Sequence, residues 1–382
     1  MSSKNNTTIL MIAATPFFSD RGCHIRIYNE MKYLKQEGID VVLCTYHLGN
    51  DIDGFKIKRI PTIPWYKKIT PGASWGKIYL DYLLFKLSWK EYRKNKPTII
   101  HAHLYESLVI ACIIKLFSGK RIKIIFDCQG SLAKEMYAYT LHKSILLKPL
   151  YYCFMLIEKL LLYIPNKILC SSKNSYDFLT STYKVPKKKI NILNDGVDED
   201  LFTSSSHNTK QIKTHLGIPS ENTVILYTGS LSAAKGVQDL FDALPKILQK
   251  RMNFTFVFAG YGDLEKEYTE KLQPWIKSKN VLFMGRFYYF DLPRYTAIAH
   301  YAIEPKKDSS ESSGKLFNYI TAGLPIICFK NEFNFNILGD QGIYINTFDD
   351  MIKINKMGKR PSIDLSPISW GSIIKKLHRI YE

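Results

Sequence analysis

Short apolar runs alternate with segments of helical length along the whole chain, and this alternation constrains the fold most. In the first half, TTILMIAA (7–14) and IDVVLCTY (39–46) enclose an amphipathic stretch from about 24 to 36. Further apolar runs leave room for a helix between them, at 97–103, 121–128, 166–172 and 189–193. Such alternation is typical of a parallel sheet with helices on its faces. We therefore predict an α/β fold.

The alternation restarts after a polar stretch, TSSSHNTKQIKTH (203–215). The apolar runs of the second half lie at 222–230, 253–260, 280–285, 300–305 and 324–329. A chain of 382 residues also exceeds what one core usually organises. We predict two Rossmann-like domains, 1–205 and 206–382, and the last helix could pack back on the first. Facing domains of this kind bind ligands in a cleft at the carboxyl ends of their strands.

Composition narrows the compartment and the partners. The formal net charge of +19 favours an anionic partner such as lipid headgroups, nucleic acid or a phosphorylated substrate, although a biased genome also enriches lysine. The seven cysteines are scattered without a C-x-x-C pair, which indicates a reducing compartment and disfavours a structural zinc site. The apolar run 9–14 is short for a signal peptide. We expect a cytoplasmic protein without a metal or other cofactor.

The strongest chemical signal is the segment Thr228–Leu244, TGSLSAAKGVQDLFDAL. A strand runs into Gly229 and a short loop, and Lys235 and Gly236 precede a helix. Glycine permits close approach of phosphate, a helix N-terminus carries partial positive charge, and lysine adds a compact cation. A surface loop with a chance lysine is the alternative, but the three features together favour an anion site.

A second segment, SSESSGKLFNYITAGLPIICF (309–329), repeats the order of polar loop, helix and strand. Ser312, Ser313 and Gly314 are candidates to begin the helix and leave unpaired N–H groups for an anion. Glu311, Lys315 and Asn318 would stand near that anion. Leu316, Phe317 and Ile320 would at the same time be buried, which does not exclude binding.

With these segments the chain resembles the family-4 glycosyltransferases of the GT-B fold over nearly its whole length. Four places carry the resemblance, and VLFMGRF (281–287), with Arg286, adds weaker support. The four are Asp20-Arg21-Gly22, NDGVDEDLF (194–202), Lys235-Gly236 and KLFNYITAGLPII (315–327).

The resemblance implies a nucleotide-sugar donor held by the second domain, an acceptor held by the first, and transfer with retention of configuration and no metal. Lys235 matches the family's diphosphate-binding lysine, and Gly22 matches a first-domain glycine near the donor phosphates. Ser230 stands where arginine is common, so another cation, Lys315 or Arg21, would have to replace it. Asn318 stands where a glutamate usually binds the ribose.

The first glutamate of the family's paired motif is also displaced. Its place falls on Ser310, with Glu311 directly beside it, so a shift of one residue in the loop would restore its role near the donor sugar. We predict Lys235, Asp127 and Glu311 as the catalytic residues.

Polar residues also follow two strands of the first domain. FDCQGSLAKEM brings Asp127, Gln129 and Glu135 to a strand end. Asp127 would hold a sugar hydroxyl or accept the acceptor's proton, or it would cap the loop. His101 and His103 would line the cleft, although core packing is the stronger interpretation for at least one of them.

The segment 75–93 combines a core stripe with an aromatic and basic face. Leu80, Leu83, Leu84 and Leu87 recur at helical spacing. The other face carries Trp75, Tyr79, Tyr82, Lys86, Trp89 and Arg93. Such a face suits an anionic membrane surface, so we expect peripheral association with the inner face of the plasma membrane.

The very apolar segment 141–167 is interrupted by charged residues and cannot comfortably span a bilayer. We expect a buried helix pair there, with shallow insertion into a membrane as the alternative.

The predicted function is sugar transfer to a lipid-linked or saccharide acceptor, in cell-surface glycan or glycolipid synthesis. A nucleotide-sugar epimerase on the same frame is the alternative enzyme. A basic nucleic-acid binder is the alternative without catalysis, but the basic clusters coincide with apolar faces and no nucleic-acid-binding signature is present.

Overall fold

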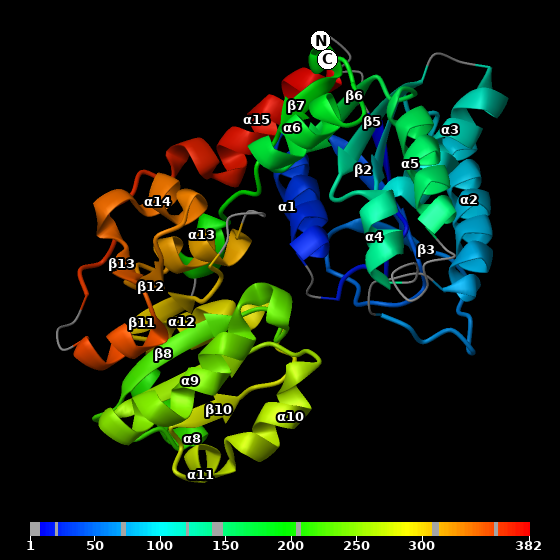
Figure 1. Cartoon of the computed structure of the whole chain (residues 1–382). Helices are drawn as coiled ribbons and strands as arrows, with labels where there is room; N and C mark the ends of the chain where they lie inside the picture. Colours follow the sequence, from blue (N-terminus) through cyan, green and yellow to red (C-terminus); the bar gives the residue numbers. More distant parts are fainter. Residues whose placement is uncertain are drawn as a thin grey trace. The chain divides into compact units, whose positions relative to one another are not determined.

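The computed structural model describes residues 8–19, 22–69, 74–119, 122–139, 148–203, 208–307, 313–354 and 358–382 (Figure 1). The chain divides into two compact units. The first consists of Met1–Asp195 and Trp370–Glu382, and the second of Gly196–Ser369. The division therefore falls before the boundary expected near 205, and the last helix belongs to the first unit.

The first unit is built on a parallel sheet of seven strands in the order β3-β2-β1-β4-β5-β6-β7. Its strands are β1 (Thr8–Ala13), β2 (Asp40–Thr45), β3 (Lys56–Arg59), β4 (Ile99–His103), β5 (Lys123–Cys128), β6 (Lys167–Cys170) and β7 (Ile190–Ile192). Its helices are α1 (Gly22–Gln36), α2 (Trp75–Asn95), α3 (Tyr105–Ser118), α4 (Leu132–Tyr139), α5 (Lys148–Leu162), α6 (Lys173–Ser181), the short η3 (Lys187–Lys189) and α15 (Trp370–Tyr381).

Helices cover both faces of this sheet, because successive strand residues point to opposite sides. On one side, Leu10 and Ile12 of β1 share a buried cluster with Leu80 of α2, Leu108 of α3 and Leu162 of α5. α1 and α15 pack against each other, and His101 of β4 is hydrogen-bonded to Tyr381 of α15. The sheet is thus buried on both faces, as parallel sheets usually are.

The second unit repeats the architecture with six parallel strands in the order β10-β9-β8-β11-β12-β13. These are β8 (Thr223–Thr228), β9 (Phe254–Ala259), β10 (Val281–Phe283), β11 (Tyr301–Glu304), β12 (Ile326–Phe329) and β13 (Ile343–Ile345). Its α-helices are α7 (Glu199–Thr203), α8 (Thr209–Leu216), α9 (Val237–Lys250), α10 (Leu264–Lys271), α11 (Gln273–Lys277), α12 (Leu292–Ile298), α13 (Gly314–Thr321) and α14 (Glu332–Leu338). The short 3-10 helices are η4 (Ala233–Lys235), η5 (Tyr289–Asp291), η6 (Gly339–Gln341), η7 (Phe348–Lys353) and η8 (Ser366–Ile368).

Buried clusters on the two faces of the second sheet hold its helices in place. Phe241 and Leu244 of α9 pack with Phe256 and Phe258 of β9 on one side. On the other side, Leu316 and Phe317 of α13 join a cluster of their own. The predicted α/β fold with two parallel sheets is confirmed.

One expectation about the first unit is wrong. The described part of the segment 141–167 contains α5, which was expected to be one of a buried helix pair. Only Glu158 and Leu162 of this helix are buried. Residues 141–147 lie outside the described part of the chain.

In the described part of the chain, none of the helices combines the length and the apolar character that crossing a bilayer requires.

Candidate active site

The order of the strands indicates where each sheet can bind a ligand. In the second unit, β8 lies between β9 and β11, so the direction in which strands are added to the sheet reverses between β8 and β11. In the first unit the same reversal occurs between β1 and β4. Ligands of doubly wound sheets bind beyond the carboxyl ends of the strands at such a point. The loops that follow β8 and β11 are the two glycine-containing segments singled out in the sequence.

The first of these loops leads from β8 through η4 into α9. Lys235 ends η4, and α9 begins after Gly236, which has φ +73° and no side-chain cap. A Cβ on Gly236 would lie 2.4 Å from the carbonyl oxygen of Pro305, the residue after β11. Only glycine fits this contact without strain, so Gly236 holds Lys235 beside the end of β11.

The second loop leads from β11 into α13. This helix begins at Gly314, and Ser313 is its N-cap residue without a side-chain cap bond. The Ser313 hydroxyl instead donates to Oε2 of Glu304, a buried residue at the end of β11. The first turn of α13 therefore keeps backbone N–H groups without a side-chain cap, as the sequence predicted.

Lys315 of α13 connects the two loops. Its Nζ lies 3.4 Å from Oε2 of Glu304 and 4.3 Å from the centroid of the Tyr227 ring. A Cβ on Gly229 would be 4.0 Å from the same ammonium. Lys315 thus brings a cation to the loop in which Ser230 stands where arginine was expected.

Hydrogen bonds fix the position of α13 against β8. The Tyr319 hydroxyl accepts a hydrogen bond of 2.8 Å from the backbone N–H of Thr228. Asn318, the residue before Tyr319, is half-buried. The Tyr227 hydroxyl donates to the carbonyl oxygen of Ser230 at 2.8 Å.

Two predicted donor contacts, Arg286 and Gly22, belong to segments other than the two loops that follow β8 and β11. Arg286 is exposed after β10, with its guanidinium 5.8 Å from the centroid of the Tyr261 ring. Gly22 is the exposed first residue of α1, with open space where a Cβ would be. The predicted site residues that lie outside the described part of the chain are Arg21, Glu311 and Ser312.

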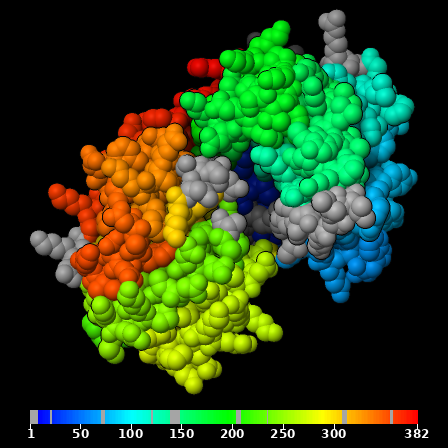
Figure 2. Space-filling view, in the orientation of Figure 1, coloured from blue at the N-terminus to red at the C-terminus, as the bar shows by residue number. Residues whose placement is uncertain are grey.

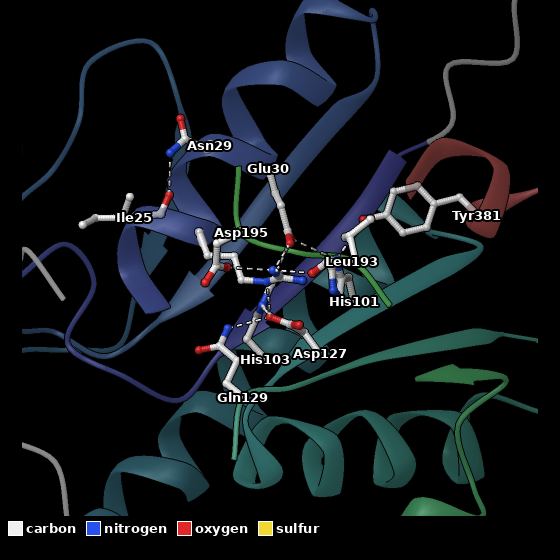
Figure 3. A network of polar contacts seen from close by, with 11 residues as sticks. Ile25, Asn29, Glu30, His101, His103, Asp127, Gln129, Leu193, Asp195 and Tyr381 are labelled. Atoms are coloured by element: carbon white, nitrogen blue, oxygen red, sulfur yellow. Dashed lines mark hydrogen bonds and ion pairs between the residues drawn. The ribbon is translucent and has the colours of Figure 1, made fainter. Parts of the chain in front are cut away.

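In the first unit, Asp127 belongs to a buried polar network (Figure 3). Its Oδ2 accepts hydrogen bonds from Arg26 Nε at 3.0 Å, His103 Nδ1 at 3.1 Å and Gln129 Nε2 at 2.5 Å. Arg26 also donates to Asp195 Oδ1 and to the carbonyl oxygen of Leu193, each at 2.9 Å. The carboxylate is therefore enclosed by cation and amide donors and does not face open solvent.

The charges of this network determine its protonation. Burial is the largest single effect on both Arg26 and Asp127 and disfavours their charges, but the attractions of several neighbours together outweigh it. The pKa of Arg26 is raised beside Asp127, Glu30 and Asp195, and the pKa of Asp127 is lowered beside Arg26 and His103. Glu30 lies 3.2 Å from Arg26 Nε, yet burial raises the pKa of this carboxyl well above its ordinary value. Asp127 is thus ionised in the fold, whereas Glu30 favours the protonated form.

His101 and His103 both point to the side of the sheet that α1 and α15 cover, and neither is exposed. Burial lowers the pKa of His101. Among the described residues, these histidines and Glu30 form the one group whose side chains could hold a metal ion, with ligand atoms within 4.8 Å of one another. The guanidinium of Arg26 already lies beside Glu30, which disfavours a second cation there.

A third histidine organises the loop between β1 and α1. The backbone N–H of Ser19 donates to His24 Nδ1 at 2.9 Å, so the other ring nitrogen carries the hydrogen. That nitrogen lies 2.7 Å from the Thr15 hydroxyl oxygen. The buried ring therefore joins both ends of the loop that precedes Gly22.

Two family models match the chain in the order of its two units. "Glycosyltransferase Family 4" matches residues 21–201, and "Glycosyl transferases group 1" matches residues 222–354. The chain belongs to the family-4 glycosyltransferases.

Individual family-4 relatives are distant. Alpha-monoglucosyldiacylglycerol synthase of Streptococcus pneumoniae is 22% identical over 296 residues, which are 76% of this chain and 64% of that protein. The match thus spans less than two thirds of the relative's length.

Solved structures share the fold, which confirms the predicted GT-B class. Sucrose-phosphate synthase from Thermosynechococcus elongatus has a TM-score of 0.73 at 16% identity, with 98% of each chain covered. Anabaena HepE, in complex with UDP and glucose, has a TM-score of 0.72 at 14% identity, again with 98% of each chain covered.

Several residues of this family-4 chain that form the polar contacts described above were not identified from the sequence. Glu304 lies inside an apolar run that was identified only as a strand. Arg26 and Glu30 lie on the predicted helix 24–36, where a charge facing inward signals a buried partner but does not identify it. Asp127 was expected to meet a ligand or cap its loop, and its pairing with Arg26 was not expected.

Proposed function

We propose that this chain transfers a sugar, with retention of configuration, from a nucleoside-diphosphate sugar to a lipid-linked or saccharide acceptor. The second unit would bind the donor and the first the acceptor. The reaction would take place at the inner face of the plasma membrane, in glycolipid or cell-surface glycan synthesis.

One observation carries the proposal: two helices without N-terminal side-chain caps, α9 and α13, follow the two strands at the reversal point of the second sheet. Uncapped N–H groups and the helix dipole favour a diphosphate. Lys235 precedes α9, and Lys315 lies in the first turn of α13. Anabaena HepE, which has this fold, was solved with UDP.

The cation that replaces the family's arginine is Lys315 in this proposal. Its contact with Glu304, at 3.4 Å, offsets part of its charge. We therefore assign the larger share of diphosphate stabilisation to Lys235 and the helix N-termini. As the sugar leaves, negative charge grows on the diphosphate, and fixed cations and N–H groups lower the energy of that state.

In the first unit, Asp127 would be a positioning residue. Its contact with His103 Nδ1 fixes the hydrogen on that nitrogen, and its contact with Gln129 orients an amide at the end of β5. Glu311 as a group near the donor sugar, and Gly22, Arg21, Arg286 and Asn318 as donor contacts, stay predictions.

A lipid acceptor is supported by the name of one relative, Alpha-monoglucosyldiacylglycerol synthase, whose named product is a diacylglycerol with one glucose. It is also supported by the exposed apolar side chains of the first unit.

The test is Lys235→Ala. Loss of one charged hydrogen-bonding group costs about 1.5–3 kcal/mol, so the variant should bind its nucleoside diphosphate about tenfold to a hundredfold more weakly. The affinity is measured by calorimetry with UDP, GDP and ADP, and transfer by product formation with and without acceptor.

Lys250→Ala, at the exposed far end of α9, is the matched control and should bind like the unchanged protein. Equal affinity in Lys235→Ala would remove the central assignment. An epimerised donor formed without acceptor would favour the epimerase alternative.

A further inference from the structure

Exposed apolar side chains are concentrated in the first unit. Of the large hydrophobic residues that are exposed in the described part of the chain, only Met252 and Phe335 belong to the second unit. Contiguous apolar surface on one side of a protein usually marks an interaction site.

Most of these residues lie on three neighbouring helices. α2 is joined to α3 by the ion pair Lys77–Glu106 at 2.6 Å, and α3 is joined to α5 by the hydrogen bond from Tyr105 to Glu158 at 2.6 Å. Figure 1 shows the three helices side by side, and Figure 2 shows light-blue, cyan and green atoms of this layer at the surface. We call their outward side the α2–α3–α5 face.

α5 has its polar and apolar positions reversed relative to an ordinary surface helix. Its buried Glu158 accepts hydrogen bonds from Tyr105, Tyr183 and Ser131 and from the N–H of Ala133. The outward stripe of α5 is apolar instead: Tyr152, Leu156 and Leu160 are 68%, 58% and 63% exposed. These positions recur every four residues and form one continuous line along the helix.

The other two helices contribute similar side chains. α2 exposes Trp75, Ile78, Tyr79 and Tyr82, and α3 exposes Leu116 and Phe117. Aromatic rings beside aliphatic side chains are typical of proteins that sit at the headgroup level of a bilayer.

The charges on this face have one sign. Each carboxylate of the three helices is bonded to a protein group: Asp81 to Tyr46, Glu91 to Asn95, Glu106 to Lys77, and Glu158 as described. The exposed charged residues are all basic: Lys86, Lys90, Arg93, Lys94, Lys148 and Lys159. Two copies of such a face would repel each other, whereas anionic headgroups would attract it.

We propose that the α2–α3–α5 face docks on an anionic lipid bilayer, with the outward stripe of α5 inserted at headgroup depth and the lysines paired with lipid phosphates. The docking itself needs no donor. The proposed function supplies only the reason for docking, which is access to a lipid acceptor.

The experiment uses the full chain and sedimentation with vesicles of phosphatidylcholine, alone or mixed with phosphatidylglycerol. We expect binding to the mixed vesicles that weakens as salt is raised. The triple variant Tyr152→Ser, Leu156→Ser, Leu160→Ser should bind them about tenfold or more weakly. The matched control, Met252→Ser with Phe335→Ser on the second unit, should bind like the unchanged protein.

UDP affinity and the thermal midpoint are measured on every variant. Unchanged values in the triple variant show that it is folded and that the donor site is intact, so a failure of docking is separate from a failure of sugar transfer. Absence of binding to mixed vesicles, or equal binding by the triple variant, would overturn the proposal. A dimer in sedimentation that the triple variant alone loses would assign the face to a second copy.

Discussion

Glu30 is the least satisfied charged group of the first unit. It has no exposed surface, and neither of its carboxyl oxygens has a hydrogen-bond partner among the described residues. Burial raises the pKa of Glu30 well above its ordinary value. Arg26 Nε lies 3.2 Å away and favours the ionised form, but the loss of hydration on burial is the larger effect, so this acid is expected to be neutral.

This state predicts a pH dependence of stability. The folded protein keeps a proton that the unfolded chain releases above about pH 4.3, the ordinary glutamate pKa. The stability from Glu30 is therefore fully present below that pH and is lost as the pH rises toward the folded pKa. Glutamine does not titrate, so the Glu30→Gln variant should not lose this stability. The unfolding free energy of the variant relative to that of the unchanged protein should therefore rise between about pH 5 and pH 8.

The measurement is chemical unfolding across this pH range. His101 has the opposite dependence because burial lowers its pKa, and it is present in both proteins. Glu37→Gln, at an exposed position just after α1, is the control and should show a constant difference. A constant difference for Glu30→Gln would mean that Glu30 is ionised in the fold.

Sequence patterns indicate candidate residues whose neighbours in the chain form a recognisable motif. They do not indicate residues whose contacts are far away in the sequence. Lys235 and Lys315 are candidates because a loop, a glycine and a helix start are adjacent in the chain. The partner of Asp127 is Arg26, 101 residues away, and no local pattern encodes that pairing. His24 was missed for a different reason: its contacts, Thr15 and Ser19, are near in sequence but depend on the loop's conformation.

At the scale of elements, Gly236 joins the two halves of the candidate donor site. Its φ is +73°, and a Cβ at this position would lie only 2.4 Å from the carbonyl oxygen of Pro305, so there is no room for a side chain. Gly236→Ala should therefore lower the unfolding free energy by about 1–3 kcal/mol and weaken nucleoside diphosphate binding. Denaturant unfolding and calorimetry measure the two effects.

Gly314→Ala is the control for stability. A Cβ there meets no atom within 4 Å, and the residue begins α13. Its unfolding free energy should be unchanged or slightly higher, since alanine favours helices. A Gly236→Ala protein as stable as Gly314→Ala would contradict the close packing of the loop against β11.

The elements that sequence reasoning missed are the edge strands β3 and β13. β3 has only four residues, Lys56–Arg59, and three of them are basic. Charges on a short edge strand prevent pairing with other chains, but they also remove the apolar signal on which prediction depends. The orientation of α5 was missed because apolar composition alone predicts burial, and only Glu158 and its partners fix which side of the helix faces inward.

At the scale of the whole molecule, the first unit is completed by α15. Its buried residues include Trp370, Ile373, Ile374 and Leu377, and each such side chain contributes about 1.5–3 kcal/mol when buried. Removal of Trp370–Glu382 should therefore destabilise the first unit selectively. In hydrogen exchange, amides of α1 and β4 should lose protection while those of β8 and β9 keep it.

Two variants accompany this deletion. Removal of the exposed Glu382 alone is the control and should leave exchange unchanged. Tyr381→Phe, which keeps the helix and loses only the bond to His101, should cost about 1 kcal/mol. Equal loss of protection in both units after the deletion would show that α15 supports the whole chain and not the first unit alone.

The return of α15 also sets an order for biosynthesis. The ribosome makes β7, then all of Gly196–Ser369, and only then the helix that covers α1. At ordinary translation speeds this interval lasts roughly 10–30 s. The first unit therefore cannot be completed until the second unit has been synthesised, and α1 stays uncovered during that interval.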